Sequence, residues 1–392
     1  MSTEIKVGPP VISINQGNSF MVTSESGEIV PERELGVFAK DTRLISRYRF
    51  FIQGKPWLLS TSSAINYYSA RFYLISPAVS IQSGKIAEQD LGLKIERTIG
   101  GGIHDDFDIT NYTDHEIAFH FGINIGSDFA DLFDVKLHET VKRGDFDSVW
   151  DPQEHALFTR YENKDFRRGI IYRLLRTGSE PHYGNGTVFF AITLKPGATW
   201  HTCAYMIPVI GGQELEPQYK CYQVSDGDTE MDHLQGRWRE STTTISTPFS
   251  LLEATFERSV TDMGALRLYE HDINDDLWLP AAGVPWFVTV FGRDSLVVSL
   301  QNMMVNPEFA LGSLRRLAEF QARERDDYRD AQPGKILHEM RFGELAHSKL
   351  VPHTPYYGTA DATILFLIVL SEAFLWTGEE KILREFRDTA LR

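Results

Sequence analysis

Residues 117–125 read IAFHFGINI, and this stretch shows most clearly which fold the first half of the chain adopts. Apolar side chains recur at every second position, at Ile117, Phe119, Phe121, Ile123 and Ile125. Because successive side chains of a strand point to opposite faces, these residues cover one face of a β-strand. We therefore predict a strand with one buried face.

Similar short segments lie on both sides of this strand, rich in β-branched and aromatic residues. They are residues 46–52, 93–99, 107–111 and 188–194. Turn signals such as Gln53-Gly54 end several of them, and no long helical pattern separates one strand from the next. We predict an antiparallel β-sandwich over residues 11–245, preceded by a disordered segment at residues 1–10.

The hydrophobic period changes near Leu251, where helix-compatible segments replace the strands. Residues 246–285 are predicted to be a linker that contains a helix and ends in a stretch rich in Gly and Pro. Three further helical patterns follow, at residues 294–305, 307–325 and 359–376. The last of them is apolar on nearly every side, so we expect it to be buried all round in a helical assembly. A final pattern opens at Glu379 and still runs at Arg392.

The charge of the chain limits its partners. It has 392 residues, of which 39 are Lys or Arg and 54 are Asp or Glu, for a formal net charge of −15. An acidic surface repels nucleic acids and anionic membranes but does not hinder a neutral sugar. No apolar run reaches the roughly 20 residues of a membrane span, and the N-terminus lacks the apolar core of a signal peptide. We expect a soluble, cytoplasmic protein.

The cysteine pattern suggests neither a disulfide framework nor a structural zinc site. Cys203 and Cys221 are the two cysteines, and neither stands in a CxxC motif or a Cys/His cluster of the sequence. We expect two unpaired thiols in a reducing cytosol. The chain also lacks the glycine-rich motifs that hold nucleotides, so we predict no cofactor and no metal.

The first candidate for chemistry is the loop at residues 284–296, in which Arg293 and Asp294 follow aromatic residues and a glycine at a predicted helix start. A guanidinium and a carboxylate side by side can bind adjacent sugar hydroxyls, since hydroxyls both donate and accept hydrogen bonds. The alternative is a structural salt bridge at the helix start.

The second candidate is the polar, glycine-bearing segment at residues 333–344, which contains His338, Glu339 and Arg341. No second histidine follows at Phe342, so this is not the HExxH spacing of a metal site. We interpret Glu339 and Arg341 as a pocket wall, with a solvated loop as an equally good alternative.

The third candidate is Asp361, in the first turn of the apolar helix and close in sequence to Tyr356 and Tyr357. Burial among aromatic side chains would raise its pKa and keep a protonated acid at neutral pH. The helix N-terminus would lower its pKa instead, in which case Asp361 simply compensates the helix dipole. The sequence leaves both readings open.

Five segments in the same order resemble glycogen-debranching enzymes of the bacterial and archaeal amylo-α-1,6-glucosidase type. Residues 36–48 and 128–135 resemble signatures of the N-terminal domain of these enzymes, and residues 291–295, 334–341 and 357–363 resemble the start of their glucoamylase-like (α/α)6 barrel. The resemblance implies a supersandwich-like domain over residues 11–245. It also implies that residues 286–392 are the first helices of a partial (α/α)6 toroid.

The resemblance also implies a mechanism, namely inverting hydrolysis of α-glucosidic branch linkages by two carboxyl groups roughly 6.5–9.5 Å apart. Asp361 would be the general acid, with Asp294 as the second choice. Arg293 and Asp294 would bind the glucose of the cleaved subsite in an α-glucan or branched oligosaccharide. The other implied substrate-binding residues are Trp286, Glu339, Arg341 and Tyr357.

The chain departs from this family in its helical part. An (α/α)6 barrel has twelve helices, and the family's general base lies in the last third of the barrel, so no residue here takes that role. We expect an incomplete enzyme that does not hydrolyse α-1,6 linkages alone, and we expect missing barrel residues to be the packing partner of its apolar helix. The alternatives are a non-catalytic glucan-binding or interaction module, or another (α/α)6 glycosidase acting on trehalose or mannosides. Residues 41–43 and 128–135 argue against the latter.

Overall fold

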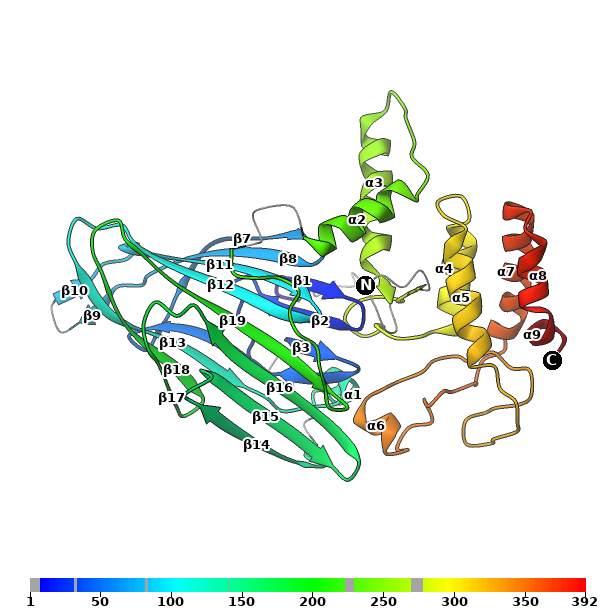
Figure 1. Cartoon of the computed structure of the whole chain (residues 1–392), viewed down its shortest axis with the longest axis horizontal. Helices are drawn as coiled ribbons and strands as arrows, with labels where there is room; N and C mark the ends of the chain where they lie inside the picture. Colours follow the sequence, from blue (N-terminus) through cyan, green and yellow to red (C-terminus); the bar gives the residue numbers. More distant parts are fainter. Residues whose placement is uncertain (1–7, 32–33, 82–83, 140, 223–228, 269–277) are drawn as a thin grey trace, which may run out of the picture. The chain divides into compact units, whose positions relative to one another are not determined.

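The computed structural model describes residues 8–31, 34–81, 84–139, 141–222, 229–268 and 278–392. Most of the predicted disordered segment, residues 1–7, lies outside these ranges. The chain divides into two compact units, one formed by Met1–Asn15 and Ser19–Gly227, the other by Gln16–Asn18 and Asp228–Arg392 (Figure 1). Each unit is described by itself below.

The first unit is built from antiparallel strands. Its larger sheet contains β7 (Leu58–Asn66), β8 (Ser69–Ile75), β11 (Leu91–Gly100), β12 (Gly102–Asn111), β14 (Asp145–Asp151), β15 (Ala156–Asn163), β16 (Phe166–Leu175), β19 (Thr199–Ile210) and β20 (Gln213–Glu214). Within the described residues this sheet has the order β14-β15-β16-β19-β12-β11-β8-β7, with β20 paired to β19. Strand β19 lies between β16 and β12, so long-range pairing joins β14, β15 and β16 to the rest of the sheet.

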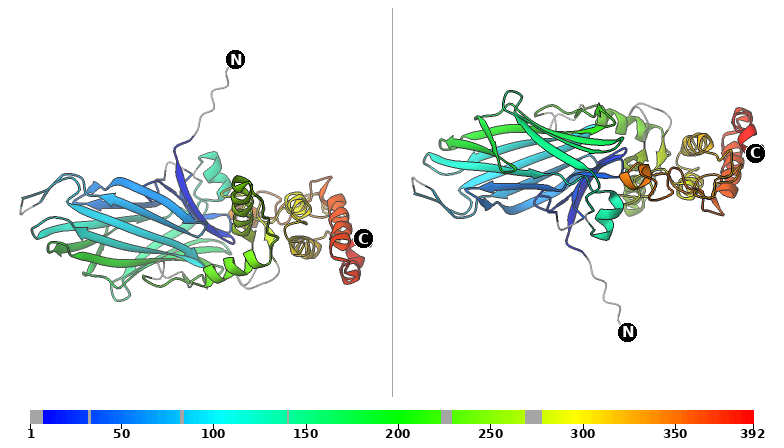
Figure 2. Two further views of the ribbon diagram at one scale, coloured as in Figure 1. Left: turned by 90° about the horizontal axis from the view of Figure 1, so that it is seen from above. Right: turned by 90° about the horizontal axis from the view of Figure 1, so that it is seen from below.

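A second sheet contains β5 (Arg47–Ile52), β6 (Lys55–Pro56), β13 (Ile117–Gly126), β17 (Pro181–Gly184) and β18 (Thr187–Leu194). Its order is β17-β18-β13-β5-β6. The smaller elements of this unit are β1 (Val11–Gln16), β2 (Ser19–Ser24), β3 (Gly36–Ala39), β4 (Thr42–Ile45), β9 (Val79–Ile81), β10 (Gly84–Ile86) and the short helix α1 (Leu132–Leu137). The sheets of this unit are seen as stacked layers in Figure 2.

Strand β13 confirms the prediction from its alternating sequence. It pairs with β5 on one side and β18 on the other, so that Phe121 lies opposite Ile52 and Phe190. Ile117, Phe119 and Phe121 are buried, whereas the intervening residues 118 and 120 are exposed. The apolar face therefore forms part of the sandwich core.

A buried ion pair crosses this core. Arg97 on β11 and Asp105 on β12 are 1 % and 0 % exposed, and two hydrogen bonds of 2.7 Å join guanidinium to carboxylate. Tyr48, from the second sheet, donates a hydrogen bond of 3.0 Å to Asp105 Oδ2. The hydroxyl of Tyr172 on β16 lies 3.4 Å from that of Tyr48. The pair and its two tyrosines link the two sheets through polar contacts inside an apolar interior.

The expectation of two unpaired thiols is wrong, because Cys203 and Cys221 form a disulfide with Cα atoms 6.2 Å apart. Cys203 lies on β19, and the chain turns at Gly211 and Gly212 into β20 before it returns over the sheet. The Tyr205 hydroxyl donates to the carbonyl oxygen of Tyr219 at 3.0 Å and holds this return. The sequence spacing of 18 residues could not show that return.

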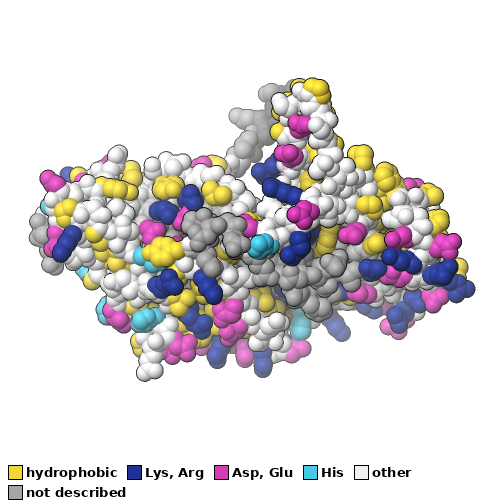
Figure 3. Space-filling view, turned by 45° about the horizontal axis from the view of Figure 1, so that its top comes forward, with side chains coloured by type: hydrophobic (Ala, Val, Ile, Leu, Met, Phe, Trp, Pro, Cys, Tyr) yellow, Lys and Arg dark blue, Asp and Glu magenta, His cyan; other side chains and the backbone are white. Residues whose placement is uncertain are grey.

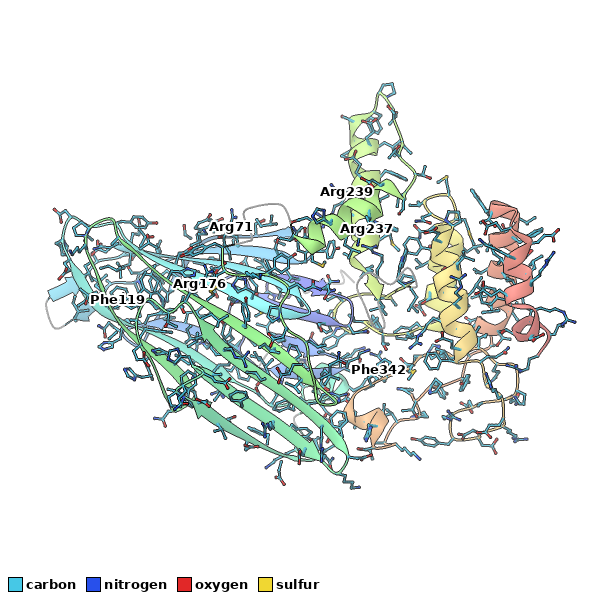
Figure 4. The ribbon with its side chains drawn as sticks, viewed as in Figure 1. Arg71, Phe119, Arg176, Arg237, Arg239 and Phe342 are labelled. Carbon is cyan, nitrogen blue, oxygen red and sulfur yellow. A yellow bond between two sulfur atoms is a disulfide. The ribbon has the colours of Figure 1, made fainter. Side chains whose placement is uncertain are left out.

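The second unit is mainly helical. Its elements are α2 (Glu230–Glu240), α3 (Ser250–Ala265), β21 (Arg267–Leu268), β22 (Leu279–Pro280), α4 (Gly292–Gln301), α5 (Glu308–Glu319), α6 (Glu344–His347), α7 (Ala362–Thr377), α8 (Glu380–Glu385) and α9 (Arg387–Leu391). Helix α2, which carries Arg237 and Arg239 labelled in Figure 4, occupies part of the region predicted as strands. A β-rich region followed by helices is nevertheless confirmed as the order of the chain. The twelve-helix toroid stays a prediction.

Aromatic residues form a core at the base of this unit. Trp238 on α2, Val260 on α3, Trp278 and Phe309 on α5 make one buried cluster. The rings of Trp278 and Phe309 meet edge to face with centroids 4.1 Å apart, and the indole of Trp238 donates to the Val260 carbonyl oxygen at 2.8 Å. This cluster joins α2 and α3 to the rest of the helical unit.

Helices α4, α5 and α7 pack against one another, as Figure 1 shows. Burial of α7 on all sides, which its apolar sequence led us to expect, is not observed. Phe366, Val369 and Ala373 are buried, but a second set of side chains is exposed, namely Ile364, Leu367, Ile368, Leu375 and Trp376. A helix that is apolar on all sides is stabilised when all of its sides are buried, but α4 and α5 bury only one side of α7.

Two further properties concern the hydrophobicity of the helices and the charge of the surface. None of the helices in the described ranges combines the length and hydrophobicity that crossing a membrane requires. On the face drawn in Figure 3, Lys and Arg side chains are interspersed with Asp and Glu side chains.

Candidate functional site

The N-terminal ends of α4 and α7 bring three predicted residues together. Helix α4 begins at Gly292, so Arg293 and Asp294 lie in its first turn, and Asp361 directly precedes α7. Arg293 Nη1 lies 3.6 Å from Asp361 Oδ2, and Arg293 Nε lies 3.8 Å from Asp294 Oδ2. The close packing of α4 on α7 thus places one guanidinium between two carboxylates that are 67 residues apart in sequence, from 294 to 361.

These three side chains are open to solvent while being held in place. The side chains of Arg293, Asp294 and Asp361 are 48 %, 34 % and 42 % exposed. Asp294 Oδ2 is a buried atom that accepts no hydrogen bond from the described residues.

Asp361 has a lowered pKa, which favours its ionised form. The Thr359 hydroxyl donates a hydrogen bond to Asp361 Oδ1, and this bond is the main cause that lowers the pKa of Asp361. Partial burial acts in the opposite direction, while Arg293 and the backbone amide of Ala362 lower the pKa further. Asp361 is therefore a carboxylate at neutral pH in the free protein.

A second part of the site is a wall made by three paired segments, residues 287–291, 337–341 and 353–357. Isolated bridges join Phe291 to Glu339 and Glu339 to Tyr356. The amide of Met340 donates to the Val290 carbonyl oxygen at 3.0 Å, and that of Tyr356 donates to the Glu339 carbonyl oxygen at 2.9 Å. The segment that contains Glu339 is therefore the middle one of the three, and it is not a solvated loop.

The side chains of the wall form a buried ionic group. Glu339 accepts a hydrogen bond from Arg341 Nε at 3.3 Å and lies 3.1 Å from His353 Nε2. Arg341 also donates to the carbonyl oxygen of Trp286 at 3.1 Å, and its guanidinium lies over the Phe291 ring. These contacts fix the three segments to one another. Phe342, which Figure 4 labels, follows directly and leads into α6.

Trp286 and Tyr357 have contacts away from the Arg293 group. Trp286 offers its carbonyl oxygen to Arg341. The Tyr357 hydroxyl donates to the carbonyl oxygen of Phe320 at 2.7 Å, and burial raises the pKa of Tyr357. Both residues thus support the wall in this structure, and their predicted substrate contacts stay predictions.

Sequence reasoning missed two partners and one cavity. Thr359 donates a hydrogen bond that lowers the pKa of Asp361, and the Thr-x-Asp spacing at a helix start was the available signal. His353 contacts Glu339 across the paired segments, which no local pattern reveals. A cavity of about 550 Å³ adjoins segment 353–357 through Thr354; its other lining residues are Asp326, Tyr328, Arg329 and Lys349.

Gly292 connects the Arg293 group to the wall. Its amide donates to the His338 carbonyl oxygen at 2.8 Å, and a Cβ at this position would overlap the carbonyl oxygen of Leu337. The same Cβ would stand 3.1 Å from that of Ala362. Only a residue without a side chain lets the start of α4 lie against both neighbours.

We expect Gly292→Ala to lower the free energy of unfolding of the helical unit by about 1–3 kcal/mol, because the wall segment must shift away. The change is measured by urea unfolding of the full chain. Gly236→Ala on α2 is the matched control, since nothing lies within 4 Å of its added Cβ. There the higher helix propensity of alanine is expected to stabilise by up to about 1 kcal/mol. Equal effects of the two substitutions would contradict the close approach at Gly292.

The β-rich unit matches a known family. Residues 14–205 match the domain described as the N-terminal domain of (some) glycogen debranching enzymes. The resemblance expected from residues 36–48 and 128–135 is thereby confirmed. The match supports a glycosidase-type function and does not specify the activity. No curated protein matches the chain in sequence.

One solved structure shares the order of a β-sandwich followed by a helical domain. A protein described as a kojibiose phosphorylase from the human microbiome is similar to this chain with a TM-score of 0.61 at 9 % identity. The similarity covers 95 % of this chain and 54 % of that chain, so this chain spans about half of that protein's length. A protein described as an aldose 1-epimerase from Escherichia coli K12 is 9 % identical and covers 50 % of this chain and 98 % of its own, with a TM-score of 0.31. The first similarity shows a β-sandwich followed by a helical domain.

Proposed function

Residues 14–205 match the N-terminal domain of some glycogen debranching enzymes, and on this premise we propose that the chain supplies the sugar-binding part of a glycoside hydrolase of the amylo-α-1,6-glucosidase type. The observation that carries the proposal is the position of Arg293 between Asp294 and Asp361 at the open N-terminal ends of α4 and α7. One guanidinium and two partly exposed carboxylates offer donors and acceptors that suit sugar hydroxyls. The proposed substrate is a branched α-glucan or oligosaccharide.

Within this proposal, Arg293 and Asp294 bind the glucose unit beside the cleaved bond. The lowered pKa of Asp361 suits an acceptor of a hydroxyl hydrogen bond better than a proton donor. Asp361 acts as the general acid only if bound substrate excludes water and raises its pKa. Asp294 is the second choice for that role, and the general base is assigned to none of the described residues.

The wall supplies rigidity to this site. Glu339, Arg341 and His353 are joined by buried contacts, so the loops beside α4 are held without a regular sheet. Preorganised loops reduce the entropy that a sugar ligand must overcome on binding. We assign Glu339 and Arg341 to the pocket lining on this ground.

The proposal also concerns the exposed face of α7. Ile364, Leu367, Leu375 and Trp376 are each more than two-fifths exposed. Contiguous apolar side chains on a protein surface mark a packing interface. We propose that further helices of a barrel cover this face.

The test is to measure, by calorimetry, the dissociation constant of an isomaltose-type oligosaccharide for the full chain. We expect Arg293→Lys and Asp361→Asn each to weaken binding by about 10- to 100-fold, because each removes a charge-assisted hydrogen bond worth about 1.5–3 kcal/mol. The matched controls are Arg258→Lys and Asp262→Asn, an exposed ion pair on α3 of the same unit. Equal binding by wild type and site variants would reject the site. Tighter binding of trehalose or a mannoside would reject the proposed substrate.

The reaction type is tested on a limit dextrin with and without inorganic phosphate. We expect this chain to bind the dextrin without releasing glucose. Glucose release would show that the described carboxylates suffice for hydrolysis. Formation of glucose 1-phosphate would reject the hydrolase assignment in favour of phosphorolysis.

A further inference from the structure

A compact group of metal-ligand side chains lies in the first unit, unrelated to the proposed sugar site. His104 and Asp106 lie on β12, Cys203 lies opposite Asp106 on β19, and Cys221 follows β20. Because every second residue of a strand faces the same side, His104 and Asp106 share one face of the sheet with Cys203. One ligand atom from each of the four residues lies within 4.8 Å of all the others.

This face is opposite to the one that carries the buried ion pair. Asp105 and Phe107 point into the sandwich core, so the neighbouring even-numbered residues of β12 point outward. They are nonetheless inaccessible: His104, Asp106 and Cys203 are at most 1 % exposed, and Cys221 is 9 % exposed. The segment that returns after β20 covers them. The group is therefore a closed site rather than a surface cluster.

Two members of the group carry buried polar atoms without a hydrogen bond. Both ring nitrogens of His104, together with Asp106 Oδ1, are buried atoms that make no hydrogen bond with the described residues. The His104 Nε2 and Asp106 Oδ1 atoms are 3.3 Å apart without hydrogen-bond geometry. His201 Nε2 lies 3.6 Å from the same Asp106 oxygen. A buried carboxylate oxygen and a buried imidazole without hydrogen bonds are costly, so these atoms call for a further partner.

The surroundings of the group resemble the outer shell of a metal site. The amide of Tyr222 donates to Asp106 Oδ2 at 3.1 Å and leaves Oδ1 directed at the group. The rings of Tyr205 and His104 meet edge to face with centroids 5.2 Å apart. His201 lies beside the cysteine, with Nε2 at 3.7 Å from Cys203 Sγ, and its Nδ1 is 2.8 Å from Asp108. Of these contacts, the hydrogen bond from Tyr222 to Asp106 is of the kind that orients a carboxylate ligand in a metal site.

We propose that His104, Asp106, Cys203 and Cys221 bind one Zn²⁺ ion when the disulfide is reduced. Two thiolates, an imidazole and a carboxylate are the donors that zinc takes in tetrahedral sites, where neighbouring donors stand roughly 3.3–3.8 Å apart. Cys–Cys Cα separations of 6.2 Å allow both the disulfide and two thiolates on one ion. In a reducing compartment, where disulfides are rare, the metal-bound state would be the prevailing one.

A phosphine reductant attacks the S–S bond, and with one water molecule it becomes the phosphine oxide while the two sulfurs become thiols. Binding of Zn²⁺ then releases one proton from each thiol to solvent. His104 binds as the neutral imidazole and Asp106 as the carboxylate.

The test is the zinc content of the full chain, purified with a phosphine reductant and without chelators, by mass spectrometry of the metal. We expect about one zinc ion per chain and at least a tenfold loss in Cys203→Ser, Cys221→Ser and His104→Ala. His120→Ala is the matched control, since His120 is an exposed residue of β13 in the same unit. A zinc content equal in wild type and in Cys203→Ser would overturn the proposal.

A second measurement keeps the test decisive if a variant fails to fold. Co²⁺ added to the reduced wild-type chain is expected to give the absorption of a tetrahedral site with a thiolate-to-metal charge-transfer band. A six-coordinate cobalt spectrum would overturn the proposal. If circular dichroism shows that reduction unfolds the β-rich unit, we expect added zinc to restore the spectrum of the folded unit. Failure to restore it would show that the cysteines act as a disulfide only.

Discussion

Replacing Asp105 by alanine is expected to lower the free energy of unfolding of the β-rich unit by about 3–5 kcal/mol. Asp105 is fully buried and holds Arg97 by two hydrogen bonds of 2.7 Å. Without this carboxylate, the Arg97 guanidinium would stay charged in the core. Among the described residues it would keep its hydrogen bond of 3.0 Å to the Gly27 carbonyl oxygen. Removing one partner of a buried pair costs more than removing both.

The measurement is urea unfolding of the full chain, with hydrogen exchange of β11 and β12 to assign the transition to this unit. Glu162→Ala is the matched control, since Glu162 pairs with Arg167 at 3.3 Å while both side chains are more than 60 % exposed. An exposed pair of this kind contributes at most about 1 kcal/mol. The double substitution Arg97→Met with Asp105→Leu is expected to recover much of the loss. A cost for Asp105→Ala no larger than that of Glu162→Ala would contradict the structural role of the pair.

The alternation of β13 and the period change near Leu251 were predictable because they depend on local spacing alone. Residues 117–126 show their burial directly in the sequence, since one face of the strand meets the core. Helix α7 was predictable for the same reason, but its surroundings were not. Its apolar sequence predicts burial on every side, whereas the exposure of Leu367 and Trp376 depends on which elements pack against the helix.

The polar contacts could not be predicted, because each joins residues that are distant in sequence or lie on different elements. Arg97 and Asp105 are charged residues in alternating strands, where a solvent-facing position is the ordinary expectation. Cys203 meets Cys221 only because the chain returns after β20. The pKa of Asp361 depends on Thr359 and on Arg293 from another helix, so the balance between burial and charge needed the structure.

The β-rich unit is also expected to lose stability steeply above about pH 10, where tyrosine ionises in the unfolded chain. Burial is the main cause that raises the pKa of Tyr48 and of Tyr172, and the Asp105 carboxylate raises both further. The folded protein therefore keeps two protons that the unfolded chain releases. Each one lowers the free energy of unfolding by about 1.4 kcal/mol per pH unit between the unfolded pKa and the folded pKa.

Tyr172→Phe separates this effect from a general alkaline denaturation. At neutral pH the variant loses one hydroxyl contact of 3.4 Å with Tyr48, which is expected to cost at most about 1 kcal/mol. Above pH 10 its slope is expected to be shallower than that of wild type by about 1.4 kcal/mol per pH unit, so the two stability curves should cross near pH 11. Tyr112→Phe is the control: Tyr112 is 69 % exposed, so water reaches its hydroxyl in the folded and the unfolded state alike. Parallel curves for wild type and Tyr172→Phe would mean that the Tyr172 hydroxyl ionises in the folded protein, which a closed interior around Arg97 and Asp105 does not permit.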